Sequence, residues 1–143
     1  MKKFLIILLL TIATVLPTFA TNWVQVGDKT YIDIDTIEPF VNDYGQVIPN
    51  QYSYWEKTLN NGDFKKLEKQ YNKKIWYMLS KNVIDLKRKT SAIKFSVLYD
   101  LKENSIDPLE IMSSLMNWQS IVPNTVGELK YMIIKEYIQQ RRY

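Results

Sequence analysis

The side chains that could do chemistry in this chain are carboxylates, lysines, tyrosines and serines. Its 143 residues include no histidine and no cysteine. Serine–histidine–aspartate and cysteine–histidine mechanisms are therefore excluded, as are zinc or iron sites built on histidine. No catalytic constellation can be recognised among the remaining residues. The sequence predicts a protein that is not an enzyme and that holds no metal ion or cofactor.

Two aspartates form the first candidate pair. Asp33 and Asp35 alternate with Ile32 and Ile34, so a strand would place both carboxylates on one face, about 7 Å apart. Such a pair could perform acid–base work or hold a cation. A solvated outer face explains the pattern better, because cation loops usually gather more oxygen ligands.

A second pair, Thr125 and Glu128, has the spacing of a capping box at the start of a helix. This explanation is preferred to a catalytic Thr–Glu pair. Behind the box, an apolar stripe leads to Arg141-Arg142 and predicts the last helix; the stripe comprises Val126, Leu129, Ile133 and Tyr137.

Basic residues gather in two short runs, Lys73-Lys74 and Lys87-Arg88-Lys89. Exposed basic loops bind acidic proteins or polyanions, but they also solubilise proteins and guard sheet edges, and the sequence leaves both explanations open. For a binding module, we choose Lys87, Arg88 and Lys89 as the contact surface. They are expected at the tip of a hairpin on a rigid sheet, where recognition loops usually lie. Antiparallel pairing would place Lys73 and Lys74 away from this tip, near Asp100.

Aromatic residues make up 13% of the chain, with ten tyrosines and four tryptophans. Aromatic stripes can bind sugars or peptides, but in a small domain they more often fill the core. Core packing is therefore the favoured interpretation of the four tryptophans within or beside expected strands, which are Trp23, Trp55, Trp76 and Trp118.

The first 20 residues have the three regions of a secretory signal: a lysine pair, an apolar-rich run over residues 4–16, and small residues at Thr18 and Ala20. A helix over that run would rise only about 20 Å, against roughly 30 Å of membrane hydrocarbon. We expect cleavage after Ala20 and a single domain over residues 21–143. The mature protein would be periplasmic, on the cell surface or secreted. It would not be a lipoprotein, because no cysteine ends the signal.

The mature domain carries 17 basic and 15 acidic side chains, a net charge of +2. This excess is too slight to indicate a nucleic acid partner. No later apolar stretch approaches the length of a membrane span. Without cysteine there is no disulfide, so the core must supply the stability.

The elements that must position these side chains are mainly strands, predicted over residues 23–26, 29–37, 52–59, 75–86 and 93–100. Turn residues occupy 42–45 and 60–63, and residues 64–74 are ambiguous between helix and loop. The last strand should turn Ile93, Phe95, Val97 and Tyr99 to the core and Lys94 to solvent.

One further short helix is predicted before the last one. Asp107 would cap it and Pro108 would be its first residue, with Leu109, Met112 and Met116 on one face. The predicted fold class is α+β: an antiparallel β-meander of about five to six strands, with the C-terminal helix packed on one face.

Several short motifs follow one another over residues 22–140. They are Tyr31-Ile-Asp33 with Thr36-Ile37, Tyr54-Trp55-Glu-Lys57, Val83-Ile-Asp85, Leu98-Tyr99-Asp100 and the run from Trp118 to Thr125. In this order the chain resembles the surface-adhesin protein E-like family of exported bacterial domains. The resemblance implies a small antiparallel sheet with a helix packed on it, surface display, adhesion to host matrix or plasma proteins, and dimers.

The chain departs from that family in its cysteines. Many relatives carry one cysteine after the aspartate-containing strand and another in the last helix, at positions that hold Leu86 and Lys135 here. Joint loss is what a bridge would require, since a single remaining thiol is a liability. The type adhesin is lipid-anchored, whereas this chain lacks the cysteine for such an anchor.

Two functions remain open. The first is a binding module that contacts a protein partner such as a host matrix or plasma protein. The second is a periplasmic accessory or structural domain of the envelope with no host ligand. A meander leaves two open strand edges, so a homodimer is also expected.

Overall fold

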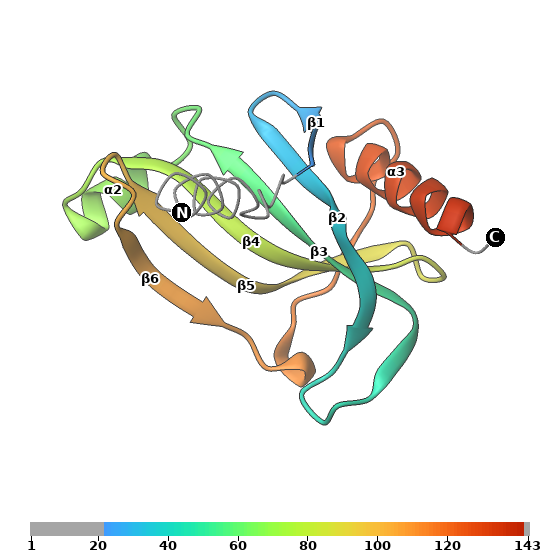
Figure 1. Ribbon diagram of the computed structural model, residues 1–143. Coiled ribbons are helices and arrows are strands. Elements are labelled where there is room, and N and C mark those ends of the chain that lie inside the picture. Colours follow the sequence, from blue (N-terminus) through green and yellow to red (C-terminus); the bar gives the residue numbers. More distant parts are fainter. Residues whose placement is uncertain (1–21, 142–143) are drawn as a thin grey trace, which may run out of the picture.

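Six strands follow one another across a curled antiparallel sheet in the computed structural model, which describes residues 22–141 (Figure 1). The expected signal peptide lies outside these residues. The strands are β1 (Trp23–Gly27), β2 (Thr30–Val41), β3 (Val47–Leu59), β4 (Ile75–Asp85), β5 (Thr90–Asp100) and β6 (Ser105–Glu110). A two-residue strand, β7 (Gln119–Ser120), pairs with β5.

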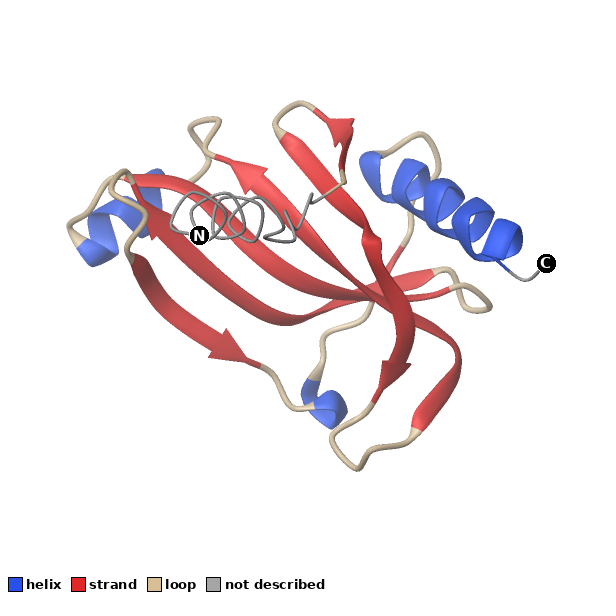
Figure 2. Cartoon of the chain, viewed as in Figure 1, coloured by secondary structure: helices blue, strands red, loops and turns tan. Residues whose placement is uncertain are grey.

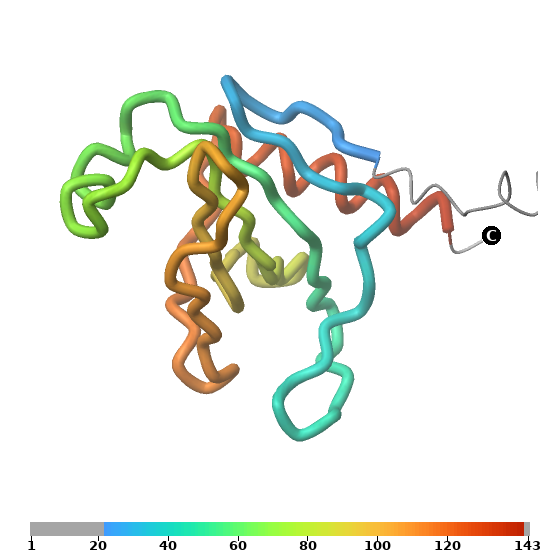
Figure 3. Tube along the Cα trace, turned by 60° about the vertical axis from the view of Figure 1, so that its left-hand side comes forward, coloured from blue at the N-terminus to red at the C-terminus, as the bar shows by residue number. Residues whose placement is uncertain are grey.

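Three helical elements lie around the sheet in the described part of the chain (Figure 2). They are α2 (Lys65–Tyr71), a 3-10 turn η1 (Ser113–Leu115) and α3 (Val126–Arg141). Figure 3 shows the sheet as an arch, with the β2–β3 hairpin and the segment from β6 to η1 as its two arms. The predicted α+β meander with a C-terminal helix is confirmed. No helix among the described residues is long and apolar enough to cross a membrane.

The main core lies between α3 and the outer face of the sheet. It comprises Val26, Ile32, Ile37, Tyr54, Ile84, Ile134 and Ile138. The predicted stripe of α3 is confirmed at Ile133 and Tyr137, which are partly buried against the main core, and is wrong at Val126 and Leu129, which are each 41% exposed. The prediction missed Ile134 and Ile138, which are the buried residues of the helix. They stand in the consecutive apolar pairs Ile133-Ile134 and Tyr137-Ile138, and both members of each pair pack against the core.

A capping box begins α3, in a modified form. The Glu128 N–H donates to Thr125 Oγ1 at 3.4 Å, as predicted. The Glu128 carboxylate accepts from the N–H of Asn124 at 2.7 Å, one residue before the position that the motif requires. The Thr125 hydroxyl in turn donates to the Val122 carbonyl at 2.6 Å.

Smaller apolar clusters close the two remaining parts of the sheet. One lies inside the curl and comprises Phe40, Val83, Ala92 and Met116. The other lies under α2 and comprises Phe64, Ile75, Leu98 and Ile106. The ambiguous segment 64–74 is therefore a short helix that covers one end of the sheet, with Phe64 as its anchor.

The expected alternation of β5 is wrong around Lys94. This side chain is buried, whereas Ile93 is 41% exposed. Lys81 pairs with Phe95 and Asn82 pairs with Ile93, which leaves Lys94 as an extra residue in a β-bulge. The bulge reverses the faces on either side of Lys94 and turns its ammonium into the curl.

The helix predicted from Asp107 and Pro108 does not form, and these residues belong to β6. Because β6 is an edge strand, the missing N–H of Pro108 breaks no ladder bond. Asp107 has a φ of +48° at a register shift of β6, and its carboxylate accepts from the Tyr71 hydroxyl in place of capping a helix. Leu109 and Met112 are exposed, so they do not share a buried face with Met116.

The aspartate pair of β2 is not a solvated face. Asp33 is buried, and the pairing of β2 with β3 is interrupted between Asp33 and Glu38. Its carboxylate accepts from the Asp35 N–H at 3.1 Å, which stabilises this irregular stretch. Asp35 is exposed. The two carboxylates therefore lie in different environments and form no acid–base pair.

Candidate functional site

The three residues chosen from the sequence, Lys87, Arg88 and Lys89, lie at the turn between β4 and β5 and are exposed. We call them the basic tip. The buried Asp85 carboxylate accepts from the N–H groups of Lys87 at 3.0 Å and Arg88 at 2.8 Å through one oxygen. Its other oxygen accepts from Gln51 at 3.1 Å. These bonds hold the turn backbone in one shape.

The basic tip is also joined to the rest of the fold. The Lys89 carbonyl accepts from the N–H of Ile121 at 2.9 Å, just after β7. The Lys89 ammonium lies 5.9 Å from the ring centroid of Tyr131 on α3, and the Lys135 ammonium lies 5.8 Å from the same ring. Lys135 thus adds a fourth positive charge beside the tip. Sequence reasoning missed it, because only the docking of α3 brings the two segments together.

The same tyrosine lies beside both positions where the resemblance implies a bridge in other members. The Tyr131 hydroxyl donates to the Leu86 carbonyl at 3.2 Å. Lys135 lies four residues after Tyr131 on α3, about one helical turn away. The Leu86 side chain packs against the main core. A hydrogen bond and a ring contact therefore connect the tip to α3 in this chain.

Lys73 and Lys74 follow α2 at the opposite end of β4, as predicted. Ile75 pairs with Asp100 at that end. The pKa of the Asp100 carboxyl is lowered, first by hydrogen bonds from the backbone and side chain of Asn104 and to a smaller extent by the charge of Lys73. The two basic runs are therefore separate surfaces.

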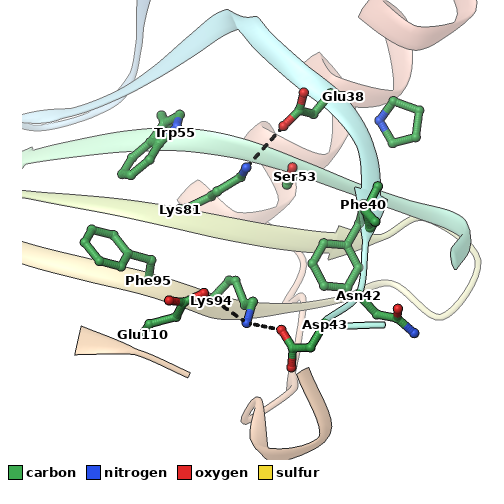
Figure 4. A pocket seen from close by; sticks show the side chains of 12 residues that line it. Glu38, Phe40, Asn42, Asp43, Ser53, Trp55, Lys81, Lys94, Phe95 and Glu110 are labelled. Carbon is green, nitrogen blue, oxygen red and sulfur yellow. Dashed lines mark hydrogen bonds and ion pairs between the residues drawn. The ribbon is translucent and has the colours of Figure 1, made fainter. Parts of the chain in front are cut away.

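A cleft of about 510 Å³ opens inside the curl (Figure 4). One row of paired residues crosses the sheet here: Asp33, Trp55, Lys81, Phe95 and Glu110 lie opposite one another on successive strands. The Trp55 and Phe95 rings meet edge to face with centroids 5.8 Å apart. Both rings are half-buried and line the cleft, so core packing does not cover them fully.

Each lysine of the cleft is paired with an acidic side chain. Lys81 lies 3.1 Å from Glu38. Lys94 lies 2.7 Å from Asp43 and 3.7 Å from Glu110, and it donates to the Ile111 carbonyl at 2.6 Å. Because these cations are neutralised while the rings are open, the cleft suits an apolar or aromatic side chain better than an anion.

Asp43 connects the two arms of the arch. One oxygen accepts from Lys94 and the other accepts from the Ser113 N–H of η1 at 2.6 Å. Two hydrogen bonds hold the pKa of the Asp43 carboxyl below its usual value. The bond from Lys94 has the larger effect, and the bond from the Ser113 N–H comes next. The β2–β3 hairpin is thereby fastened to η1 across the mouth of the cleft.

The prediction that the tryptophans fill the core is wrong for Trp76, which is 42% exposed and meets Tyr77 edge to face. Trp118 packs against the inner cluster, and Trp23 is half-buried. Within residues 22–141, no group of three or more acidic side chains is placed to hold a metal ion.

Comparison with known proteins identifies the fold. No family model matches the sequence, and no curated protein gives a significant match. The structure of Haemophilus influenzae protein E is similar with a TM-score of 0.54 at 13% identity, over 86% of this chain and 92% of that one. Its crystal form II gives 0.52 at 14%, over 85% and 94%, and protein E from non-typeable Haemophilus influenzae gives 0.52 at 12%, over 86% and 82%. The chain therefore has a protein E-like fold, as its motifs indicated.

Proposed function

We propose that this protein is an exported, non-enzymatic binding module that attaches to an acidic protein through the basic tip. The observation that carries the proposal is the fixed shape of the tip. Lys87, Arg88 and Lys89 are exposed, yet Asp85 and Ile121 hold the backbone beneath them. A preorganised loop loses little conformational freedom when it binds, so its charges contribute more of their attraction to affinity.

The family that the motifs resemble supports a role in adhesion, with host matrix or plasma proteins as the candidate partners. Lys135 extends the positive surface from the tip onto α3. Complementary charge would speed encounter with an acidic partner and weaken as salt screens it, since the Debye length falls from about 10 Å at 0.1 M to 3 Å at 1 M. The binding should therefore depend on salt.

The test is titration of candidate matrix and plasma proteins at two salt concentrations. We compare the wild type with a triple variant, Lys87→Glu, Arg88→Glu and Lys89→Glu. At low salt the variant should bind at least about tenfold more weakly, with a smaller salt dependence. Exposed substitutions usually change stability by less than about 0.5 kcal/mol each, so both proteins should melt alike. Equal affinities without salt dependence would contradict a role for the tip.

Location distinguishes this function from a periplasmic accessory role. Protease added to intact cells should digest a surface-displayed protein, whereas a periplasmic protein is protected until the outer membrane is opened. Full protection would favour the accessory role and remove host proteins from the set of partners.

A further inference from the structure

Positive charge is concentrated on α2 and the residues that follow it. Residues 65–74 include five lysines and one glutamate, a net charge of +4. Since the mature domain carries +2, the rest of it has a net charge of −2. A charge imbalance of this kind within one small domain indicates an anionic partner for the basic segment.

These side chains surround a hollow of about 570 Å³, which is lined by Lys65, Glu68, Lys69, Asn72, Lys73 and Lys74. Lys65 and Lys69 lie one helical turn apart, about 6 Å along the axis. Asn72 ends α2 with a left-handed backbone, φ +49°. The chain then turns back, so that Lys73 and Lys74 form another side of the hollow.

The glutamate in this segment is engaged in holding the fold. Glu68 Oε1 accepts from the Ile75 N–H at 3.0 Å and from the Asn60 amide at 3.2 Å. Its side chain is only 15% exposed, and its one ion pair is with Lys74 at 3.8 Å. Among the described residues, Lys65, Lys66, Lys69 and Lys73 form no ion pair within 4 Å. The charges of Lys65, Lys66 and Lys69 are therefore open to a ligand, whereas the charge of Lys73 also acts on the Asp100 carboxyl.

This arrangement works against the stability of the helix itself. Lys65 and Lys69 stand at i and i+4, where like charges destabilise a helix. With seven residues, α2 has few internal bonds to offset that repulsion. A local conflict of this kind is expected at functional sites, where a bound ligand removes the repulsion.

We propose that this hollow, the lysine site, binds a linear sulfated polysaccharide. No aromatic side chain lines it to stack on bases, which disfavours single-stranded nucleic acid. It also contains no arginine, so each contact with an oxyanion is made by a single ammonium group and not by a bidentate guanidinium. Sulfate groups repeated along a flexible chain suit separate ammonium groups spread around a shallow hollow.

Immobilised heparin is the probe, with affinity measured from low to moderate sodium chloride. The test variant is Lys65→Glu, Lys69→Glu and Lys73→Glu. The basic-tip triple variant described above is a matched control, because it changes the charge by the same amount at the other end of β4. A second triple variant replaces Lys65, Lys69 and Lys73 by glutamine, which removes their positive charges without adding negative ones. Circular dichroism checks that every variant is folded.

The wild type should lose affinity steadily with salt, in proportion to the number of ammonium groups engaged. The Lys→Glu variant of the lysine site should bind heparin at least about tenfold more weakly, and its salt slope should fall by about 2. The basic-tip variant should change by less than about threefold. An equal loss of heparin affinity in both variants would show a general effect of charge and would overturn the site. Unchanged heparin affinity in the lysine-site variant would overturn it as well.

Two competing ligands complete the experiment. Single-stranded DNA or vesicles of anionic lipid that bind the lysine site more tightly than heparin would overturn the choice of polysaccharide. The result is independent of the protein partner: a failure of the lysine site appears with heparin and its own variant, whereas a failure of the basic tip appears with matrix proteins and the tip variant.

Discussion

Replacing Lys94 by methionine tests how the arch is held closed. The Lys94 side chain is 10% exposed, and its ammonium bonds Asp43 and the Ile111 carbonyl. Methionine keeps an unbranched apolar chain of similar length but donates no hydrogen bond. The substitution therefore removes the ionic contact between the two arms and leaves the packing of the bulge nearly intact.

The burial of the pair sets the size of the effect. Breaking a buried ion pair costs about 3–5 kcal/mol, whereas an exposed pair contributes about 0–1 kcal/mol. Water reaches Asp43, whose side chain is 32% exposed, so we expect Lys94→Met to lower the free energy of unfolding by about 2–3 kcal/mol. Lys81→Met is the matched control in the same cleft. Lys81 and Glu38 are 31% and 60% exposed, so its cost should stay below about 1 kcal/mol.

Urea unfolding and thermal melting measure both variants. For a domain of this size, 1 kcal/mol shifts Tm by roughly 3–5 °C, so Lys94→Met should melt about 6–15 °C lower and Lys81→Met less than about 5 °C lower. Similar shifts in the two variants would refute the argument from burial. A Lys94→Met protein as stable as the wild type would show that the Lys94 ammonium contributes nothing to holding the arms together, because the bond from the Ser113 N–H to Asp43 remains in the variant.

Acid provides a second measure of the same contact. The pKa of Asp43 is lowered from its ordinary value of 3.8, chiefly by Lys94. Asp43 therefore binds a proton less readily in the folded protein than in the unfolded chain. The stability that this carboxylate contributes is present above pH 3.8 and is lost as pH falls through its pKa in the folded protein. The difference between the wild type and Lys94→Met should narrow below pH 3.8. A constant difference would contradict the assignment.

Four further outcomes are expected. Thr125→Ala should destabilise the domain by about 1 kcal/mol through loss of the cap of α3, and an unchanged melting curve would show that the 3.4 Å bond contributes nothing. Leu86→Cys with Lys135→Cys should form a bridge under oxidising conditions, seen as a mobility shift on non-reducing gels, and an unchanged mobility would contradict the alignment of these positions. N-terminal sequencing of exported protein should begin at Thr21, and finding Met1 would refute the cleavage. Sedimentation at tens of micromolar should show a homodimer, and a monomer there would count against pairing of the open edges.

The order of the elements could be predicted because it depends on local patterns. Alternation and turn residues located the first five strands, although β3 begins at Val47 and not at the predicted Tyr52. The mistakes arose where tertiary pairing overrides a local signal. Asp107 and Pro108 look like a helix start in isolation, but pairing with β5 makes them an irregular edge strand. The bulge at Lys94 likewise depends on the strand opposite.

The candidate surfaces divide in the same way. The basic tip could be predicted because its three charges are consecutive and lie between two recognisable strands. The cleft could not, since Trp55 and Phe95 meet only after the register of three strands is known and the sheet has curled. The lysine site could be predicted only in part. The sequence singled out Lys73-Lys74, but Lys65 and Lys69 join them around one hollow only because the chain turns at Asn72.

The sheet order has a consequence for how the molecule assembles as it emerges, N-terminus first, from a ribosome or a translocation channel. Each strand from β2 to β6 pairs with the strand made just before it, so hairpins can form one after another without waiting for distant sequence. The main core cannot close in this way. Val26 and Ile32 pack with Ile134 and Ile138, which appear only after all the strands have been made. Until then, the outer apolar face of the growing sheet is open to water and to other chains, and α3 completes the fold by covering it.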